Sequence, residues 1–462
     1  MQRQRTSRKV LLLIAALAMV AASCGRSDDN SGSGGGGNTG GGETETPSGD
    51  EFAVDTADCP DNGTDGISGD TITLASSFPQ SGLTAAFAQI SKGYKAYFDQ
   101  VNDAGGVEVA GKKYKIEVVD KDDEYNAAKT SANITELVGN DGSKAFAVFN
   151  VVGTANNIAI RDDLGENCVP NLFAATGSPA WGNAEYPWLV GSTLAPYTVE
   201  AVAFADYLKE NDPTAKVAML VQDDDYGKAY EQGFAQAIEG TDITVTKVAK
   251  YTAGSNDVSA QVTELAATGA DVFFNGSTLL ACPNALQKAS EANWTRAHTF
   301  VSGTCISKTL MGLAGADADG VIAYTNTIDP ANPAYADSDA LAAYKETLEK
   351  FGESDVDPEN GIVAYGYTQA AILVKVLEDS PELTRSAVLD TMRNIDVSEQ
   401  MGMLVDGVTL KMNADDAYLA ENVQTIQYKF VSEDEAYFEN VGEILDFEGK
   451  TKEITPEDLI NG

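Results

Sequence analysis

The sequence predicts an α/β protein made of two doubly wound parallel-sheet lobes that are joined by crossing hinge segments. Three observations predict this fold. Segments with a strand pattern alternate with amphipathic helices, and this alternation begins a second time near the middle of the chain. Residues 145–151 form a continuous apolar run, which is typical of a strand buried in a parallel sheet. No Gly/Pro-rich linker separates the two series, so we expect the lobes to lie close together.

The first series of elements extends to about residue 175. Its first helix is amphipathic and ends before the pair Gly105-Gly106, as helices commonly do. The acidic residues 120–123 are expected to form a turn. The pattern predicts strands at 71–76, 114–119, 145–151 and 169–175, and helices at 90–101, 127–138 and 154–164.

The second series repeats the pattern from about residue 198. Two further helices are predicted at 362–377 and 386–395, and residues 424–431 alternate like a strand. The second series itself predicts strands at 216–222, 270–275 and 298–302, and helices at 198–210, 226–239 and 284–292.

The chain is expected to cross between the lobes three times. We place these crossings near 193–197, 325–330 and 401–406, and we expect the lobes to close about them when a ligand binds. The first lobe would then comprise residues 58–194 and 328–402, and the second would comprise residues 195–327 and 403–462.

The N-terminus predicts export. Residues 1–9 carry four bases and no acid, and residues 10–22 form an apolar run too short to span a bilayer as a stable helix, so we assign residues 1–23 to a signal peptide. Small residues before Cys24 resemble the lipobox of bacterial lipoproteins, although that family prefers Leu where this chain has Ala21. The resemblance implies lipidation of Cys24 and an extracytoplasmic protein anchored to the cell membrane by its N-terminal lipid. The alternative is an ordinary secretory signal with a chance cysteine.

Composition limits the partners. Residues 24–57 are assigned to a flexible tether, because the stretch up to residue 50 is mostly Gly, Ser, Asn, Thr and Glu and has too little apolar surface to fold. The formal net charge is −39, and loss of residues 1–23 would take it to −43. So acidic a chain is not expected to bind nucleic acid or anionic lipid, both of which require basic patches.

Four cysteines remain besides Cys24, and they are expected to pair outside the cytosol. Three connectivities are possible. We favour Cys59 with Cys168 and Cys282 with Cys305, because each of these bridges stays within one lobe while the alternatives would staple the lobes together. Zinc binding is the rival, but the chain has a single histidine and no CxxC spacing.

Ligands of open α/β sheets bind outside the carboxyl ends of the strands, so function should lie in the loops that follow the predicted strands. These loops resemble the branched-chain amino-acid type of periplasmic binding protein, which has the type I two-lobed fold. The resemblance covers roughly residues 68–400. It rests, in chain order, on Phe78-Pro79-Gln80-Ser81-Gly82, the N-x-x-G-G-V element at 102–107, the acidic residues 120–123, Gly153-Thr154, Val169-Pro170 before Ala174-Ala175-Thr176, and Asp224-Asp225-Tyr226-Gly227.

The resemblance implies an extracytoplasmic solute-binding protein of an ABC importer that captures an amino acid, amide or related small acid. Hydroxyl groups and loop N–H groups of the first lobe would hold a polar or anionic head group, and Tyr226 would close over it from the second lobe. For Thr154 a plain helix cap is the alternative. The candidate ligand-binding residues are Gln80, Ser81, Phe87, Gly153, Thr154, Ala174, Ala175, Thr176, Tyr226 and Thr304.

One departure from the family leaves the ligand open. Amino-acid-binding members place a glutamate in the second lobe against the ligand's ammonium group, whereas residues 302–306 of this chain contain no acid. A buried ammonium without a counter-charge is costly. Either another acid takes this place or the ligand lacks an ammonium group.

Catalysis, metals and cofactors are not expected. Neither a G-x-S-x-G elbow nor a G-x-x-x-x-G-K-[ST] loop occurs, and Asp223–Asp225 is expected to cap a helix rather than bind a metal. The expected partners are a small ligand and the permease and ATPase subunits of an importer, with the protein itself a monomer. The alternative is a lipoprotein of the same fold that senses a ligand for a membrane signalling partner.

Overall fold

The structure is a computed structural model that describes residues 51–60, 63–139 and 142–462. The predicted signal peptide, Cys24 and the tether up to residue 50 lie outside the described residues. Within the described ranges, no helix combines the length and the apolar character that crossing a bilayer requires.

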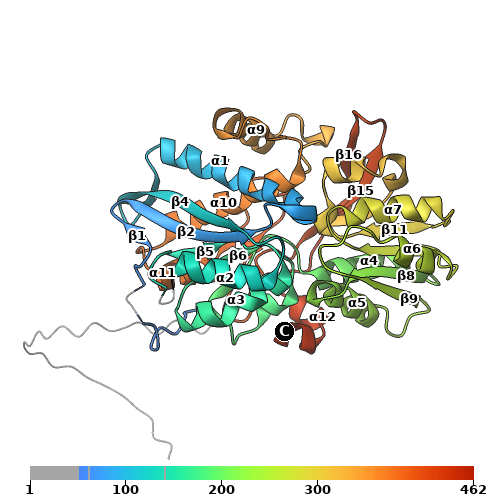
Figure 1. Ribbon diagram of the computed structural model, residues 1–462, viewed down its shortest axis with the longest axis horizontal. Helices are drawn as coiled ribbons and strands as arrows, with labels where there is room; N and C mark the ends of the chain where they lie inside the picture. Colours follow the sequence, from blue (N-terminus) through green and yellow to red (C-terminus); the bar gives the residue numbers. More distant parts are fainter. Residues whose placement is uncertain (1–50, 61–62, 140–141) are drawn as a thin grey trace, which may run out of the picture. The chain divides into compact units, whose positions relative to one another are not determined.

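The first half of the chain forms a largely parallel sheet, with strand order β3-β4-β2-β5-β6-β7 and β1 paired to β2 (Figure 1). The side chain of Leu74 packs on one face of this sheet and that of its neighbour Ala75 packs on the other, as alternation along a strand requires. The strands are β1 (Ile67–Ser68), β2 (Thr71–Phe78), β3 (Val107–Val109), β4 (Lys112–Asp122), β5 (Ala147–Phe149), β6 (Asn171–Ala174) and β7 (Leu189–Gly191).

Helices cover both faces of the first sheet, as predicted. On one face α1 packs against α10, a helix from much later in the chain, and on the other face lie α2 and α3 (Figure 1). The chain therefore returns to the first sheet after β12 and adds β15 and β16 to the second sheet only later. The helices of the first half are α1 (Gln89–Asp103), α2 (Ala127–Val138), α3 (Thr154–Glu166), α9 (Asp339–Phe351), α10 (Gly361–Asp379) and α11 (Arg385–Arg393), with the 3₁₀ turns η1 (Gly82–Ala88), η2 (Pro179–Gly182) and η5 (Pro333–Tyr335).

The second sheet has strand order β16-β15-β12-β11-β10-β8-β9. Its five strands from β12 to β9 are parallel, and β15 and β16 extend it as an antiparallel pair. The strands are β8 (Lys216–Gln222), β9 (Thr244–Tyr251), β10 (Val272–Gly276), β11 (His298–Val301), β12 (Ile322–Thr325), β15 (Val423–Phe430) and β16 (Ala436–Leu445); β13 (Asp396–Val397) and β14 (Leu410–Lys411) form a separate pair.

Helices also cover both faces of the second sheet. Buried side chains of α4 and α5 pack on one face, and those of α6 and α7 pack on the other. The elements are α4 (Tyr197–Asn211), α5 (Asp225–Ala237), α6 (Ser259–Ala266), α7 (Ala281–Glu291), α8 (Lys308–Gly312), α12 (Thr451–Ile454) and α13 (Glu457–Asn461), with η3 (Gly303–Cys305) and η4 (Gly315–Ala318).

Three segments that run between the sheets are hydrogen-bonded to one another. The side-chain amide of Asn326 donates to the carbonyl of Thr193, and the N–H of Val405 donates to the carbonyl of Asn326 at 2.8 Å. The N–H of Ile328 donates to the carbonyl of Met403 at 2.7 Å. These contacts lie within the three stretches where the sequence predicts crossings, and the exact lobe boundaries remain a proposal.

Both favoured disulfides are present. Cys59 and Cys168 are joined with their Cα atoms 5.6 Å apart, and Cys282 and Cys305 are joined with their Cα atoms 6.2 Å apart. The first bridge attaches the N-terminal segment to the residue range just before β6. The second bridge attaches the start of α7 to η3, which follows β11.

Residues 51–57, which the sequence assigns to the tether, instead pack against α11. The N–H of Phe52 donates to the side-chain oxygen of Asn394, whose amide donates back to the carbonyl of Phe52. The guanidinium of Arg393 lies over the Phe52 ring, 4.1 Å from its centroid. Phe52 supplies apolar surface that the stretch up to residue 50 lacks, so residues 51–57 do not belong to the predicted flexible tether.

The acidic residues 120–123 also differ from the prediction. We expected a turn, but β4 continues to Asp122 because it pairs in parallel with β2 up to Phe78. Several elements were not predicted, including β9, α6, β12, α9, β16 and the C-terminal helices. Most carry many partly exposed positions, which weakens the apolar pattern; in β16 residues 440–443 are all exposed.

Candidate functional site: the cleft between the two sheets

A cavity lies where the carboxyl ends of strands from both sheets meet. Residues that follow β5, β6, β8, β10, β11 and β12 all line it, as expected for open α/β sheets. Its lining is rich in tyrosine, threonine and aliphatic side chains. Glu200 and Asp329 are the acids in this lining, which contains no lysine, arginine or histidine among the described residues.

The first wall of the cavity includes the N-terminus of α3. Gly153, which precedes this helix, has a φ of 102°, and a Cβ atom there would lie 2.8 Å from the ring of Tyr125. Both constraints favour glycine. The N–H groups in the first turn of a helix have no acceptor within the helix, so this wall presents partial positive charge to the cavity.

Thr154 is the first residue of α3, and its hydroxyl lies 2.6 Å from that of Thr176. Both side chains are buried, but only Thr154 lines the cavity. Thr176 therefore orients the Thr154 hydroxyl from behind. Either hydroxyl can donate to the other, so the Thr154 hydroxyl can act towards a ligand as a donor or as an acceptor.

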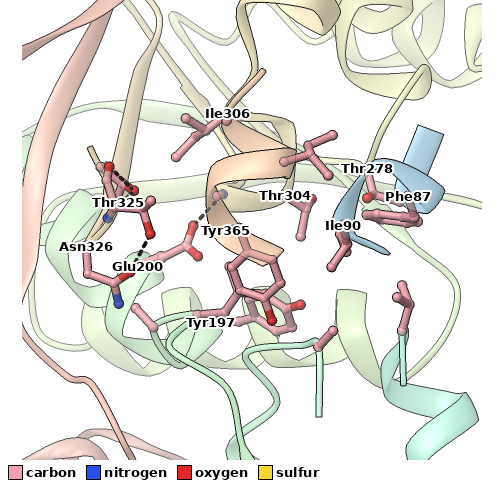
Figure 2. Close-up of a pocket in the computed structure, with 18 of the residues that line it drawn as sticks. Phe87, Ile90, Tyr197, Glu200, Thr278, Thr304, Ile306, Thr325, Asn326 and Tyr365 are labelled. Carbon is pink, nitrogen blue, oxygen red and sulfur yellow. Dashed lines mark hydrogen bonds between the residues drawn. The ribbon is translucent and has the colours of Figure 1, made fainter. Parts of the chain in front are cut away.

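The second wall contains Glu200, an acid in the interior of α4 that is 1% exposed (Figure 2). Its Oε2 atom accepts the N–H of Gly303 at 2.9 Å and the hydroxyl of Tyr230 at 3.0 Å. Burial raises the pKa of Glu200 to about 8, although these two hydrogen bonds favour the ionised form. A cation that entered the cavity would favour the ionised carboxylate and so lower the pKa of Glu200 again.

Asp329 lines the same cavity but is bound differently. Its Oδ2 atom accepts the N–H of Phe438 at 2.7 Å, and its Oδ1 atom accepts the N–H of Ala331 at 3.1 Å. Burial raises the pKa of Asp329 to about 6. Because backbone donors occupy both oxygens, Asp329 chiefly fixes the chain after β12, whereas Glu200 has backbone and hydroxyl donors on one oxygen.

Tyr226 lies on α5 with its hydroxyl turned into the second wall. This hydroxyl is 2.9 Å from the Ser302 hydroxyl and 3.2 Å from the Thr304 hydroxyl. The Tyr226 ring packs edge-on against Tyr197, with 4.8 Å between ring centroids. The ring, rather than the hydroxyl, is thus the part of Tyr226 that is free to contact a ligand.

The structure brings six of the ten predicted ligand-binding residues together around the cavity. Figure 2 shows Phe87 and Ile90 near Thr304 and Thr278, which come from the other sheet. The predicted residues in the lining are Phe87, Gly153, Thr154, Ala175, Tyr226 and Thr304.

The other four predicted residues do not line this cavity. Gln80 and Ser81 are exposed and hydrogen-bond to the acidic end of β4, at 2.7 Å to Asp120 and 2.5 Å to Asp122. Ala174 is fully buried at the end of β6, and Thr176 lies behind Thr154.

Several lining residues were missed, above all Glu200. It lies inside a helix, whereas the prediction considered only loops after strands. A signal was nevertheless present, since Glu200 is the single charged residue in the otherwise uncharged stretch 197–205. An isolated acid on a buried helix is costly and therefore points to a function. Other missed residues are Ile90, Tyr125, Tyr197 and Tyr365.

Two α/β lobes that enclose a cleft at the carboxyl ends of their strands define a type I solute-binding fold. The chain belongs to the periplasmic binding protein family, whose model matches residues 71–429. Membership of this family implies a location outside the cytoplasm. Its relatives are solute-binding proteins of transporters rather than enzymes, as the sequence predicts.

The relatives include proteins of the predicted branched-chain amino-acid type. A Leu/Ile/Val-binding protein homologue of Brucella melitensis is 32% identical over 206 residues, which are 44% of this chain and 54% of that relative. A branched-chain amino-acid ABC transporter protein of Thermus thermophilus with bound valine superposes with a TM-score of 0.72 at 19% identity, covering 82% of this chain and 97% of that one. A fatty-acid ABC transporter substrate-binding protein of Thermomonospora curvata has a TM-score of 0.68 at 19% identity, covering 84% and 95%.

Proposed function

We propose that this protein is the solute-binding subunit of an ABC importer and that it captures a small amino acid between its two lobes. The observation that carries this proposal is the opposite polarity of the two cavity walls. The N-terminus of α3 favours an anionic group, and Glu200 on the facing half favours a cationic one.

The fit to an amino acid follows from these charges. A carboxylate would accept hydrogen bonds from the first turn of α3 and from Thr154. An ammonium group would pair with the Glu200 oxygen that Gly303 and Tyr230 leave open. Aliphatic and aromatic side chains elsewhere in the cavity, such as Ile90, would cover an apolar side chain of the ligand. Glu200 would then replace the glutamate that the family carries after β11.

The relatives support this ligand class without fixing it. One solved relative has bound valine, whereas another belongs to a fatty-acid transporter. A fatty acid carries a carboxylate but no cation, so it would leave the Glu200 carboxyl protonated and without an ionic partner. The buried carboxyl therefore favours the amino acid. Delivery to a permease and anchoring through Cys24 belong to the same proposal.

Calorimetric titration with three matched ligands tests this function. We would compare L-valine with 3-methylbutanoate, which lacks the ammonium group, and with 2-methylpropylamine, which lacks the carboxylate. We expect valine to bind at least about 100-fold more tightly than either analogue, since each loses one buried ionic contact. Equal affinity for valine and 3-methylbutanoate would contradict the ammonium site, and binding of the amine alone would contradict the role of α3.

A further inference from the structure

Three acids from two separate loops converge outside the ligand cavity. Asp416 and Glu421 lie in the loop between β14 and β15, and Glu448 lies in the turn between β16 and α12. One carboxylate oxygen from each of the three residues lies within 4.8 Å of the other two. The sequence predicts no metal site here, and Glu448 is far from the other two acids in the chain.

Glu421 is the best fixed of the three. It is fully buried, and its two oxygens accept the N–H groups of Gly449 at 2.7 Å and Thr451 at 3.0 Å. Asp416 is held at one oxygen by the N–H of Tyr418 at 3.1 Å. Each carboxylate oxygen has a second lone pair, so these hydrogen bonds leave room for a further partner.

Two other oxygens at this place lack partners. Glu448 Oε2 is shielded from solvent and accepts no hydrogen bond among the described residues. Thr451 is fully buried beside the Glu421 carboxylate, and its hydroxyl makes no hydrogen bond of ordinary geometry in the described chain. Buried polar atoms are normally satisfied, so both oxygens point to a partner that is not part of the protein.

Neighbouring bases do not supply that partner. Lys411 lies near Glu448, and Arg393 lies near Asp416. Among the residues that the structure describes, however, none of the three acids forms an ion pair with a lysine or arginine. Three carboxylates held this close repel one another unless one of them takes up a proton or a cation lies between them.

We propose that Asp416, Glu421 and Glu448 bind a calcium ion. All the available donors are oxygens, which hard cations prefer, and calcium accepts six to eight of them in flexible geometry. The Thr451 hydroxyl and water would complete the shell. Magnesium fits less well, because it requires a nearly ideal octahedron of ligands.

The ion would fasten the β14–β15 loop to the start of α12. Helix α12 packs against α4, and the hydroxyl of Thr455 lies 2.7 Å from that of Thr198 on α4. Calcium would thereby hold the C-terminal segment on the helix that carries Glu200. This role does not depend on the identity of the solute in the cleft.

Thermal unfolding of the full-length protein after EDTA treatment tests the site, with calcium chloride compared against sodium chloride at equal ionic strength. The sodium arm is needed because so acidic a protein is stabilised by any salt. We expect calcium to raise the melting temperature further and to saturate at or below about 1 mM, the range of extracellular sites. Glu448→Gln should weaken calcium binding at least about tenfold.

The control is Glu433→Gln, which removes an exposed acid from the β15–β16 turn. It should respond to calcium like the unmodified chain. Calorimetric titration of the EDTA-treated protein with calcium chloride gives a second readout that does not require unfolding. Equal responses of the two variants, or the absence of saturable calcium binding by the unmodified chain, would overturn the proposal.

Discussion

The two walls of the cleft are built in different ways. The first wall is formed by loops that follow strands and by the N-terminus of α3, so it presents backbone N–H groups and a hydroxyl. The second wall takes its charge from Glu200, a residue inside a helix, supported by Gly303 and Tyr230. In the proposed binding mode, one wall would therefore recognise the ligand through backbone geometry and the other through a single buried side chain.

Removal of each disulfide in turn should show which wall of the cleft depends on a disulfide for its ligand-binding geometry. Loop-closure entropy predicts a loss of about 5 kcal/mol in the free energy of unfolding for Cys59→Ser/Cys168→Ser and about 3 kcal/mol for Cys282→Ser/Cys305→Ser. Only the second pair lies next to Gly303 and Thr304, so only its loss should also weaken ligand binding. Denaturant unfolding and calorimetric titration measure the two effects. Weaker binding by the first variant alone would contradict this assignment.

Substitution of Glu200 should have the largest effect on affinity. Glu200→Gln leaves the ligand's ammonium unpaired and should weaken amino-acid binding by about 2 to 5 kcal/mol. The matched control is Glu210→Gln, on the same helix but exposed, which should bind normally. Calorimetric titration of both variants decides the matter, and unchanged affinity in Glu200→Gln would remove the basis for the second wall.

A glycine pair tests the first wall. Gly153→Ala forces a side chain into a backbone with φ of 102° and against Tyr125. It should lower the free energy of unfolding by about 1 to 3 kcal/mol. It should also weaken ligand binding. Gly165→Ala, in the same helix with open space around it, should instead stabilise the protein by about 0.5 to 1 kcal/mol. Thermal unfolding and ligand titration provide both values. Similar behaviour of the two variants would show that the entry to α3 is not constrained.

The smallest expected effect concerns the threonine behind the first wall. Thr176→Ala removes the hydrogen bond that orients the Thr154 hydroxyl and should weaken binding by about 1 kcal/mol. Thr176→Ser keeps the hydroxyl and should restore most of the affinity. A larger loss in Thr176→Ala than in Thr154→Ala, measured by titration, would mean that Thr176 contacts the ligand itself.

Prediction from the sequence succeeded where local pattern and topology suffice. Runs such as 216–222 and the helix at 127–138 have the boundaries predicted from periodicity, and the parallel sheets covered by helices on both faces follow from alternation of strands and helices. The positions of Gly153 and Thr154 follow from the rule that parallel strands end at the binding site.

Sequence reasoning failed where packing between distant segments decides the outcome. Gln80 and Ser81 follow the right strand, but the continuation of β4 brings Asp120 and Asp122 to them and occupies their polar groups. Glu200 reaches the cleft because α4 lies on the second sheet beside η3, which no local pattern encodes. Residues 51–57 likewise appear featureless until α11 is folded against them.

The measurement that tests the central claim most directly is proton release on amino-acid binding. The pKa of Glu200 is raised to about 8, so its carboxyl is mostly protonated at pH 7 in the empty protein. An ammonium group favours the ionised form, lowers this pKa and displaces the proton. For the same reason, affinity should rise as pH increases from 6 towards 8, while the ligand's ammonium stays protonated.

Calorimetric titration at pH 7 in buffers of different ionisation enthalpy counts the protons released. We expect close to one proton per ligand in the unmodified protein and in Glu210→Gln, and almost none in Glu200→Gln. Asp329→Asn should still release the proton, because backbone donors occupy both oxygens of Asp329. Binding of an amino acid without proton release, or release that persists in Glu200→Gln, would contradict the role of Glu200 as the ammonium site.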